Sequence, residues 1–201
     1  MSTETGRPPR VYTKTGDDGT TDLLYGGRMA KDAPAMQVNG TVDEAQAVLG
    51  LARADLEPGS DLDLLLVRLE RELYVLMAEV ATAPKNRSKL VAGKSLVTEA
   101  MVTDLEHQID VLLEDTPMPA DFVVPGANRP SAALDLARTV IRRAERLYVA
   151  QPLEGSSIGP YLNRLSDLLW ALARHVEGES HLLARGPRRG ARRPSSGSPS
   201  A

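Results

Sequence analysis

The chain has no cysteine among its 201 residues. This absence excludes disulfide bonds, thiolate metal sites and cysteine nucleophiles. Aromatic residues are also scarce, at 3%, with one phenylalanine and one tryptophan, whereas hydrophobic residues make up 42%. The core must therefore consist of leucine, alanine and valine, which favours helices, because strands draw on aromatic and β-branched residues. A chain of this length is normally one domain that can bury a sizeable core.

Long apolar runs are missing as well. No stretch approaches the roughly 18 apolar residues that a membrane-spanning helix needs. The first residues, MSTETGRPPRVYTKTG, lack the apolar core of a signal peptide. The net charge of -3 argues against nucleic-acid binding by bulk electrostatics. We therefore expect a cytoplasmic protein whose partners include neither a membrane nor a nucleic acid.

Metal-binding and catalytic arrangements of histidine are not evident either. His107, His175 and His181 are isolated, and no Glu-x-x-His occurs, so a di-metal helical bundle is not expected. The chain has no evident Ser/His/Asp arrangement. If the protein is an enzyme, it offers little obvious acid, base or nucleophile of its own. Its conspicuous groups bind anions, which points to a reaction in which the protein positions two reactants that bring their own reactivity.

Apolar residues recur at helical spacing in five segments. The expected helices span residues 34–56, 61–82, 99–115 (with Thr98 as N-cap), 130–150 and 158–176. Their short connections predict an all-α protein, an up-and-down bundle of five helices.

The composition divides the chain into three parts. Residues 1–33 are polar and rich in turn-forming glycine, so we assign them to an N-terminal segment. Residues 34–182 form the helical bundle domain. Residues 183–201 form a C-terminal tail that we expect to be disordered, because from Gly186 onward no apolar residue is larger than alanine.

The helix predicted at 130–150 carries a row of arginines. Arg138, Arg142 and Arg146 lie four residues apart and so share one face. Like charges at this spacing repel one another, so some compensation is expected. Glu145 can screen part of the charge from the adjoining row, and a polyphosphate would screen the rest, because guanidinium groups match phosphate oxygens. A solvated, arginine-rich face is the alternative.

Residues 13–21, TKTGDDGTT, combine glycines, hydroxyl groups and a lysine in a segment too irregular for a helix. Such loops can wrap phosphates with their backbone N–H groups, although this one is not a Walker A motif. Asp17 and Asp18 would repel a bare phosphate, so phosphate binding requires Mg²⁺ nearby or carboxylates that turn away. A plain turn is the alternative.

Two further groups of polar residues lie on predicted helices. Asp43 and Glu44 follow Gly40-Thr41 in the first helix, and the simpler interpretation is that they complement the helix dipole. On the fifth helix a polar row includes the only tryptophan and lies away from the leucine stripe, which suggests an interface. An ordinary amphipathic helix is the alternative. The row consists of Asn163, Asp167, Trp170 and Arg174.

Four motifs occur in a defined order along the chain. They are YTKTGDDG at 12–19, GTVDE at 40–44, RRAER at 142–146 and YLNRLSD at 161–167. Together they resemble the PduO-type ATP:cob(I)alamin adenosyltransferases, and the resemblance runs from about residue 11 to residue 176. The chain departs from the family at 125–128, PGAN, where a Gly-Gly often follows the proline.

The resemblance implies a fold, a reaction and partners. Members are five-helix bundles that assemble as homotrimers, and ATP and the corrinoid meet at the subunit interfaces. Cob(I)alamin, the substrate, attacks C5′ of ATP and expels triphosphate, giving adenosylcobalamin. Mg²⁺ is expected to accompany ATP, bound mainly through its phosphates. A flavin-dependent reductase and a cobalamin-dependent acceptor enzyme are the expected protein partners. The missing general base fits this chemistry, because Co(I) has no proton to lose.

The resemblance also assigns roles to residues. Arg142 would hold the triphosphate, while Glu145 and Asn163 would orient Arg142 or the nucleotide. Arg138 would pair with Asp43 across the subunit interface. The remaining ATP-binding residues would surround the phosphates with Mg²⁺; they are Thr13, Lys14, Thr15, Gly16, Asp17, Gly19 and Lys31.

Phe122 would lie against the lower face of the corrin. The resemblance thus implies three catalytic residues: Arg142, Glu145 and Phe122. The alternative for Phe122 is a core anchor. Two other functions remain open for the whole chain: a non-catalytic helical scaffold that uses the fifth-helix polar row, and a phosphoryl transferase built on a helical bundle.

Overall fold

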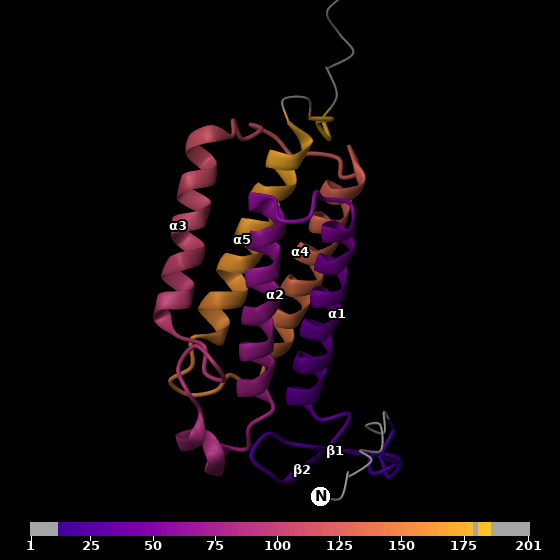
Figure 1. Ribbon diagram of the computed structural model, residues 1–201, viewed down its shortest axis with the longest axis vertical. Coiled ribbons are helices and arrows are strands. Elements are labelled where there is room, and N and C mark those ends of the chain that lie inside the picture. Colours follow the sequence, from indigo (N-terminus) through magenta and orange to yellow (C-terminus); the bar gives the residue numbers. More distant parts are fainter. Residues whose placement is uncertain (1–11, 179–180, 186–201) are drawn as a thin grey trace, which may run out of the picture.

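Five α-helices run along the long axis of the molecule in the computed structural model, which describes residues 12–178 and 181–185 (Figure 1). The prediction of five helices is confirmed, and their starts and ends lie within a few residues of those expected. The helices are α1 (Pro34–Ala54), α2 (Asp61–Val80), α3 (Glu99–Asp115), α4 (Arg129–Tyr148) and α5 (Ile158–Glu177).

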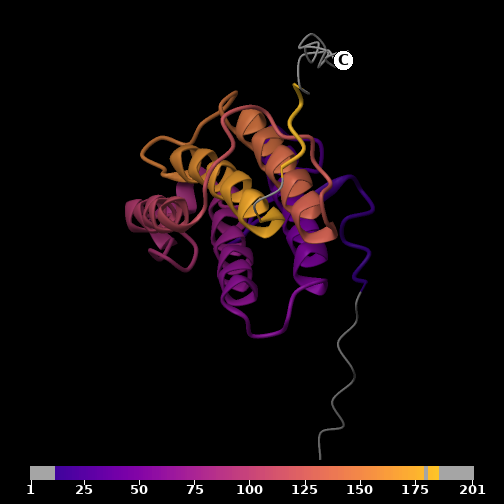
Figure 2. The same ribbon diagram turned by 90° about the horizontal axis from the view of Figure 1, so that it is seen from above.

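Successive helices point in opposite directions, so the predicted up-and-down order is confirmed (Figure 1). α4 packs between α1 and α5, and α2 packs against α1. The helix α3 lies at the edge of the bundle and packs against α5 (Figure 2). The helices α3 and α5 run parallel, because α4 lies between them in the sequence and points the opposite way. The connection 116–128 crosses the end of the bundle from α3 to α4 (Figure 1).

The core is built mainly of leucine, valine and alanine, as the composition predicts. Three helices begin at side-chain caps, in which the cap oxygen accepts a backbone N–H that has no partner within the helix. Ser60 caps α2, and Thr98 caps α3, as predicted. At the start of α4, Asn128 forms a capping box with Ser131. Within the described residues no helix is both long and apolar enough to cross a membrane.

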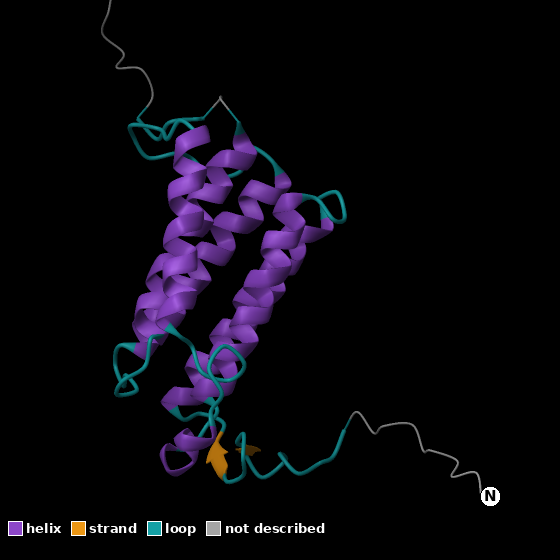
Figure 3. Cartoon of the chain, turned by 60° about the vertical axis from the view of Figure 1, so that its left-hand side comes forward, coloured by secondary structure: helices purple, strands orange, loops and turns teal. Residues whose placement is uncertain are grey.

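The sequence did not predict three small elements at one end of the bundle (Figure 3). Strand β1 (Thr20–Asp22) pairs antiparallel with β2 (Arg28–Ala30), so that Thr21 lies opposite Met29. A 3-10 helix, η1 (Pro84–Lys89), follows α2. Strands of three residues are too short for alternating polarity to appear, so the segment was expected to contain only turns.

The opposite end of the bundle holds the connection 116–128 and residues 181–185 (Figure 1). Leu183 forms an antiparallel bridge with Val123, although the sequence assigns residue 183 to the tail. Backbone pairing, which needs no apolar side chain, therefore extends the packed part of the chain to Ala184. The rest of the predicted tail, residues 186–201, lies outside the described residues.

Candidate functional site

The first candidate element is the loop at residues 13–19, which β2 and the residue after it hold in place. The Lys31 side chain donates to the carbonyl oxygen of Gly16 at 2.7 Å, and its backbone N–H donates to the carbonyl of Gly19 at 2.9 Å. A Cβ on Gly16 would lie 3.0 Å from Lys31 Nζ, and Gly19 has a φ of 80°. Both positions therefore favour glycine, one for close packing and the other for its backbone conformation.

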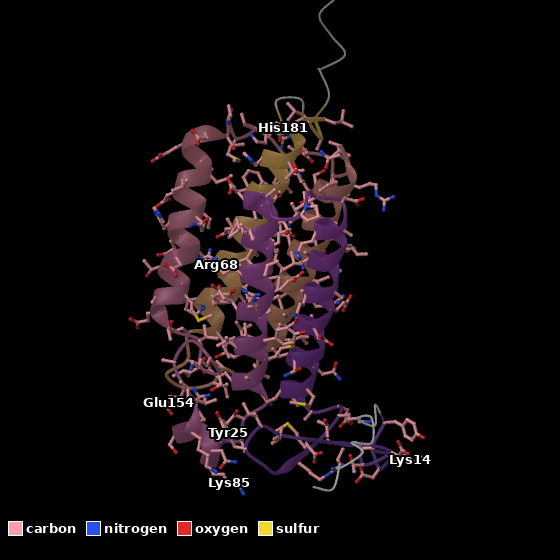
Figure 4. All side chains as sticks on the ribbon, in the orientation of Figure 1. Lys14, Tyr25, Arg68, Lys85, Glu154 and His181 are labelled. Carbon is pink, nitrogen blue, oxygen red and sulfur yellow. The ribbon has the colours of Figure 1, made fainter. Side chains whose placement is uncertain are left out.

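Lys14 is held in a strained backbone conformation at the tip of the same loop. Its φ of 62° lies in the left-handed region, which typically costs a non-glycine residue about 1–3 kcal/mol. The Lys14 side chain is exposed, as is that of Asp17. The hydroxyl groups of Thr13 and Thr15 share a hydrogen bond of 2.8 Å. The loop thus presents a cation, hydroxyl groups and a carboxylate to solvent at the β1–β2 end of the bundle (Figure 4).

Arg28, on β2, ties this loop to the hairpin and was missed by the sequence reasoning. Its guanidinium contacts Asp22 at 2.8 Å and Asp18 at 3.2 Å, and also donates to the carbonyl of Thr15. Asp18 accepts from both the side chain and the backbone of Thr20, and these hydrogen bonds, with the nearby Arg28, lower its pKa. Both carboxylates are exposed, but that of Asp18 is hydrogen-bonded within the loop.

The second element is the arginine row of α4, whose members differ in their surroundings. Arg142 and Arg146 are exposed, and Arg146 donates to the backbone carbonyl of Arg142 at 3.0 Å. Arg138 is about three-quarters buried and contacts Asp135, one turn earlier on α4, at 3.0 Å. Asp135 therefore offsets part of the repulsion that the spacing predicts. Arg143, outside the row, pairs with Glu44 on α1.

Beside this row, Asn163 on α5 donates to Glu145 Oε1 at 3.0 Å. The carbonyl oxygen of the same Asn163 amide accepts from Arg164 at 2.6 Å, and Arg164 also contacts Glu106 on α3 at 2.8 Å. The structure therefore brings together two of the predicted ATP-binding residues and links them to α3. Arg164 lies within the YLNRLSD motif, but no role was predicted for it.

Asp43 lies on the exposed surface of α1, ten residues into the helix. The helix-dipole interpretation of Asp43 and Glu44 is wrong, because α1 begins at Pro34 and its first turn contains no acidic residue. Among the described residues of this chain, the carboxylate that pairs with Arg138 is Asp135, not Asp43. Any contact of Asp43 with an Arg138 therefore requires a second copy of the chain.

The third element is Phe122, which is 78% exposed. This exposure rules out the core-anchor alternative. The ring borders an open hollow that Trp170 of α5 also lines. Other exposed apolar side chains lie on the same paired segments, namely those of Val124, Leu182 and Leu183. Clusters of this kind often mark a ligand or partner surface.

The polar row predicted on α5 is not a single exposed face. Asp167 is exposed, and Asn163 and Trp170 are partly buried, but Arg174 is only 2% exposed. Arg174 lies beneath Trp170, 5.9 Å from the ring centre, and pairs with carboxylates of α4 and α5. The interface interpretation of the whole row is therefore wrong for Arg174, because α4 covers it.

Within one chain these three elements are far apart. The loop at 13–19 lies at one end of the bundle, and the connection 116–128, which carries Phe122, lies at the other, as does His181 (Figures 1 and 4). Arg142 is 13 residues along α4 from its first residue, which corresponds to about 20 Å along the helix. One chain therefore does not assemble the predicted phosphate loop and Phe122 into one pocket.

Comparison with known proteins assigns the family. A family model described as cobalamin adenosyltransferase matches residues 11–176. The chain belongs to this family. It is 37% identical to a corrinoid adenosyltransferase of Bacillus subtilis, with 85% of this chain and 88% of the relative covered. It is 38% identical to a corrinoid adenosyltransferase of Citrobacter freundii, with 84% and 95% covered.

Solved structures support the same assignment for this adenosyltransferase. The fold matches a PduO-type ATP:corrinoid adenosyltransferase of Lactobacillus reuteri, in a phenylalanine-to-alanine variant complexed with cobalamin and ATP. The TM-score is 0.75 and the identity 26%, with 88% of this chain and all of the other covered. An arginine-to-lysine variant of that enzyme, complexed with ATP, matches with a TM-score of 0.73 and 27% identity.

The described residues contain no group of three or more His, Asp or Glu side chains placed to hold a metal ion. A protein cage for a resident metal is therefore missing from this part of the adenosyltransferase. Mg²⁺ does not need such a cage, because it keeps several waters and commonly binds through substrate phosphates with one or two carboxylates. Asp17, exposed beside Lys14, is a carboxylate of this kind.

Proposed function

We propose that this adenosyltransferase transfers the 5′-deoxyadenosyl group of ATP to cob(I)alamin, giving adenosylcobalamin and triphosphate. One observation carries the proposal: nearly nine-tenths of the chain matches a structure whose ligands are cobalamin and ATP. The chemistry of the described residues agrees with it. Attack by Co(I) on C5′ needs no general base, and the candidate site is made of arginines, a lysine and polar anchors rather than a nucleophile and a base.

In the proposed mechanism, charge collects on the departing triphosphate. Arg142 can stabilise that charge, because its guanidinium is exposed and an arginine can donate two charge-assisted hydrogen bonds to a phosphate group at once. Glu145 and Asn163, joined by a hydrogen bond of 3.0 Å, would orient Arg142 or the nucleotide. The loop at 13–19 and Lys31 supply backbone and side-chain donors to the phosphates. The barrier falls because ATP is held in line with the attacking metal and because triphosphate is stabilised as it leaves.

Mg²⁺ bound with ATP would neutralise part of the phosphate charge. Asp17 and the hydroxyl groups of Thr13 and Thr15 are the groups that would face it. Asp18 is less available, because Thr20 and Arg28 already contact its Oδ1. This division supports a role for Asp17 and answers the concern that two adjacent carboxylates would repel the nucleotide.

We further propose that the active enzyme is a homotrimer whose sites lie between subunits. The separation of the loop at 13–19 from Phe122 supports this, because one site can use both only if neighbouring copies contribute them. Head-to-tail contacts of this kind close into rings. Asp43 is exposed and is not the intrachain partner of Arg138, which suits the predicted pair between subunits.

Phe122 is proposed to face the corrin. Its exposed ring can exclude water from the lower side of cobalt and cannot coordinate the metal. Removing the lower ligand makes Co(II) easier to reduce to Co(I). Phe122 is the only phenylalanine of the chain, and the Lactobacillus reuteri enzyme was solved with one phenylalanine replaced. We place the reaction in the cytoplasm, with a flavin-dependent reductase supplying electrons and a cobalamin-dependent enzyme receiving the product.

The test is anaerobic incubation of the purified protein with ATP, Mg²⁺ and chemically reduced cob(I)alamin. We expect adenosylcobalamin, detected by its visible spectrum, and triphosphate in equal amounts. Formation of ADP would instead support a phosphoryl transferase. No reaction at all would support the scaffold alternative.

A further inference from the structure

A buried chain of charges connects the arginine row of α4 to the segment that carries Phe122. At its centre is Arg174, which is 2% exposed. Its Nη2 lies 2.6 Å from Asp135 Oδ2 on α4 and 2.9 Å from Glu177 Oε1 on α5. The side chains of both carboxylates are at most 5% exposed. Three ionic groups are thus removed from water at the interface of two helices.

Stability alone does not explain this arrangement. Burying charged groups carries a large desolvation cost, and well-packed apolar residues of similar volume are often as stabilising or more so. Leucine would serve at position 174 if packing were the only requirement, since leucine already fills the rest of this helix interface. The positions that the chain of charges reaches at its two ends suggest another purpose.

One end reaches Arg138. Asp135 uses Oδ2 for Arg174 and Oδ1 for Arg138 Nε, at 3.0 Å. A carboxylate held from both sides cannot rotate freely, so Arg138 is fixed through its Nε. The terminal nitrogens of Arg138 then remain for a contact outside this pair. The carboxylate of Asp135 therefore sets the direction of the one arginine in the row that is mostly buried.

The other end reaches the Phe122 segment. Glu177 Oε2 lies 3.0 Å from His181 Nδ1. Directly after His181, the carbonyl of Leu182 accepts from the backbone N–H of Val124 at 2.7 Å, and the N–H of Ala184 donates to the carbonyl of Phe122 at 2.7 Å. His181, at the end of the bundle opposite Lys14, is thus the anchor of the strand-like residues that pair with the Phe122 segment (Figure 4).

We propose that Arg174 is a positioning residue of the adenosyltransferase. Through Asp135 it fixes Arg138, and through Glu177 and His181 it fixes the backbone on which Phe122 is carried. The inference rests on the proposed function for its kinetic consequences, but the pairing of residues 122–124 with 182–184 can be measured without turnover. Neither Asp135, Arg174, Glu177 nor His181 is assigned to substrate contact.

Two near-isosteric variants separate the two ends. Asp135→Asn weakens the link to Arg138, and Glu177→Gln weakens the link to His181. A third variant, His181→Ala, cuts the outermost link and leaves the buried charges in place. The control is Asp55→Asn, which removes an exposed ion pair of 3.0 Å to Arg129 of α4. For each variant we measure backbone amide exchange, the KM for ATP and the absorption of four-coordinate cob(II)alamin, the form in which cobalt has lost its lower ligand.

For Glu177→Gln and His181→Ala we expect the exchange rates of the Val124 and Ala184 amides to rise at least tenfold. The four-coordinate cob(II)alamin signal should fall at least fivefold, while the KM for ATP stays within twofold of the parent value. For Asp135→Asn the KM for ATP should rise at least fivefold, with a smaller effect on the cobalt signal. The control should change none of these readouts by more than twofold.

If Asp135→Asn and Glu177→Gln change the KM for ATP and the cob(II)alamin signal by equal factors, the structure is lost generally. That result would overturn the inference. Unchanged exchange at Val124 and Ala184 in His181→Ala would overturn it as well, and this variant decides the question if the buried ones do not fold. A parent protein that makes no adenosylcobalamin refutes the proposed function instead, and the exchange measurement still tests the anchoring.

Discussion

Asn163 Nδ2 lies 3.0 Å from Glu145 Oε1, so that α5 supports the carboxylate beside the arginine row of α4. The orientation of the amide is set from its other side, because Asn163 Oδ1 accepts from Arg164. The donor face of Asn163 must therefore point at Glu145. The two residues lie 18 apart in the chain, and their contact joins two of the four sequence motifs.

Arg142→Ala should lower turnover by about 100- to 1000-fold, the usual effect of removing one charge-assisted contact to a transition state. The melting temperature should stay close to that of the parent, because the side chain is exposed and adds little packing. Arg129→Ala is the matched control, since Arg129 is an exposed arginine of the same helix. Turnover of Arg142→Ala within threefold of the parent would remove this residue from the mechanism.

Asp43 and Arg138 should be energetically coupled through the proposed trimer interface. Each single change to alanine should weaken the trimer or raise the KM for ATP, because it leaves a partly buried partner without its counter-charge. The double variant should lose less than the sum of the two. A charge swap is a poorer test, because an aspartate at position 138 would face Asp135. Sedimentation measures the stability of the trimer and titration the affinity for ATP, and each is compared in a double-mutant cycle. A coupling energy of zero would argue against direct contact.

Mixing two inactive variants tests whether one site uses two chains. Lys14→Ala disables the loop, and Arg142→Ala disables the row on α4. If neighbouring copies supply these two groups, random mixed trimers should recover about a quarter of the sites, because both groups are intact there. If one chain supplies both groups, every site keeps one defect and activity stays at the level of the single variants.

Phe122→Ala should keep the affinity for ATP nearly unchanged but lose the four-coordinate cob(II)alamin signal. The rate should fall sharply when Co(II) must be reduced on the enzyme, and less when cob(I)alamin is supplied already reduced. The variant should fold normally, since the ring is 78% exposed. Loss of ATP binding in step with activity would show that the ring acts on the nucleotide side instead.

The helices follow closely from the sequence, because their signals are local. The stripe of Leu162, Leu165, Leu169 and Leu172 predicts α5, and Thr98 predicts the start of α3 as its N-cap. The motifs also predict the three site elements. What local patterns miss depends on tertiary contacts. Arg28 becomes central to the loop at 13–19 only when the strand register places it opposite Asp22.

The position of Arg174 illustrates the same limit. On α5 it lies away from the leucine stripe, so the sequence places it on the face predicted to form an interface. Only the packing of α4 brings Asp135 against it and removes both from water. The exposure of Phe122 was equally undetermined, because an isolated phenylalanine in a connection fits both a core anchor and a ligand contact. Two of its pairing partners, residues 183 and 184, come from a segment assigned to the tail.

Glu72 should make the protein less stable as the pH rises through the acidic range. Burial, the largest influence, raises its pKa in the folded state, and the hydrogen bond of 2.8 Å from Tyr161 opposes this shift. A raised folded pKa means that its contribution is fully present below the unfolded pKa, about 4.3, and is lost as the pH passes the folded value.

Urea unfolding at several pH values measures this effect. Relative to Glu72→Gln, the parent should lose unfolding free energy as the pH rises from about 4 to about 6. Tyr161→Phe removes the donor that lowers the pKa, so the loss should extend to higher pH. A parent that gains stability over the variant as the pH rises would show that Glu72 is stabilised in its charged form.

The position of bond cleavage tests the central claim most directly. ATP labelled with ¹⁸O in the oxygen that bridges C5′ and the α-phosphate is incubated with cob(I)alamin and the protein, and the products are weighed by mass spectrometry. Attack at C5′ breaks the C5′–O bond, so we predict unbroken triphosphate that carries the label, in equal amount to adenosylcobalamin. Label retained in ADP or AMP would mean that a phosphorus–oxygen bond breaks instead, and would contradict adenosyl transfer.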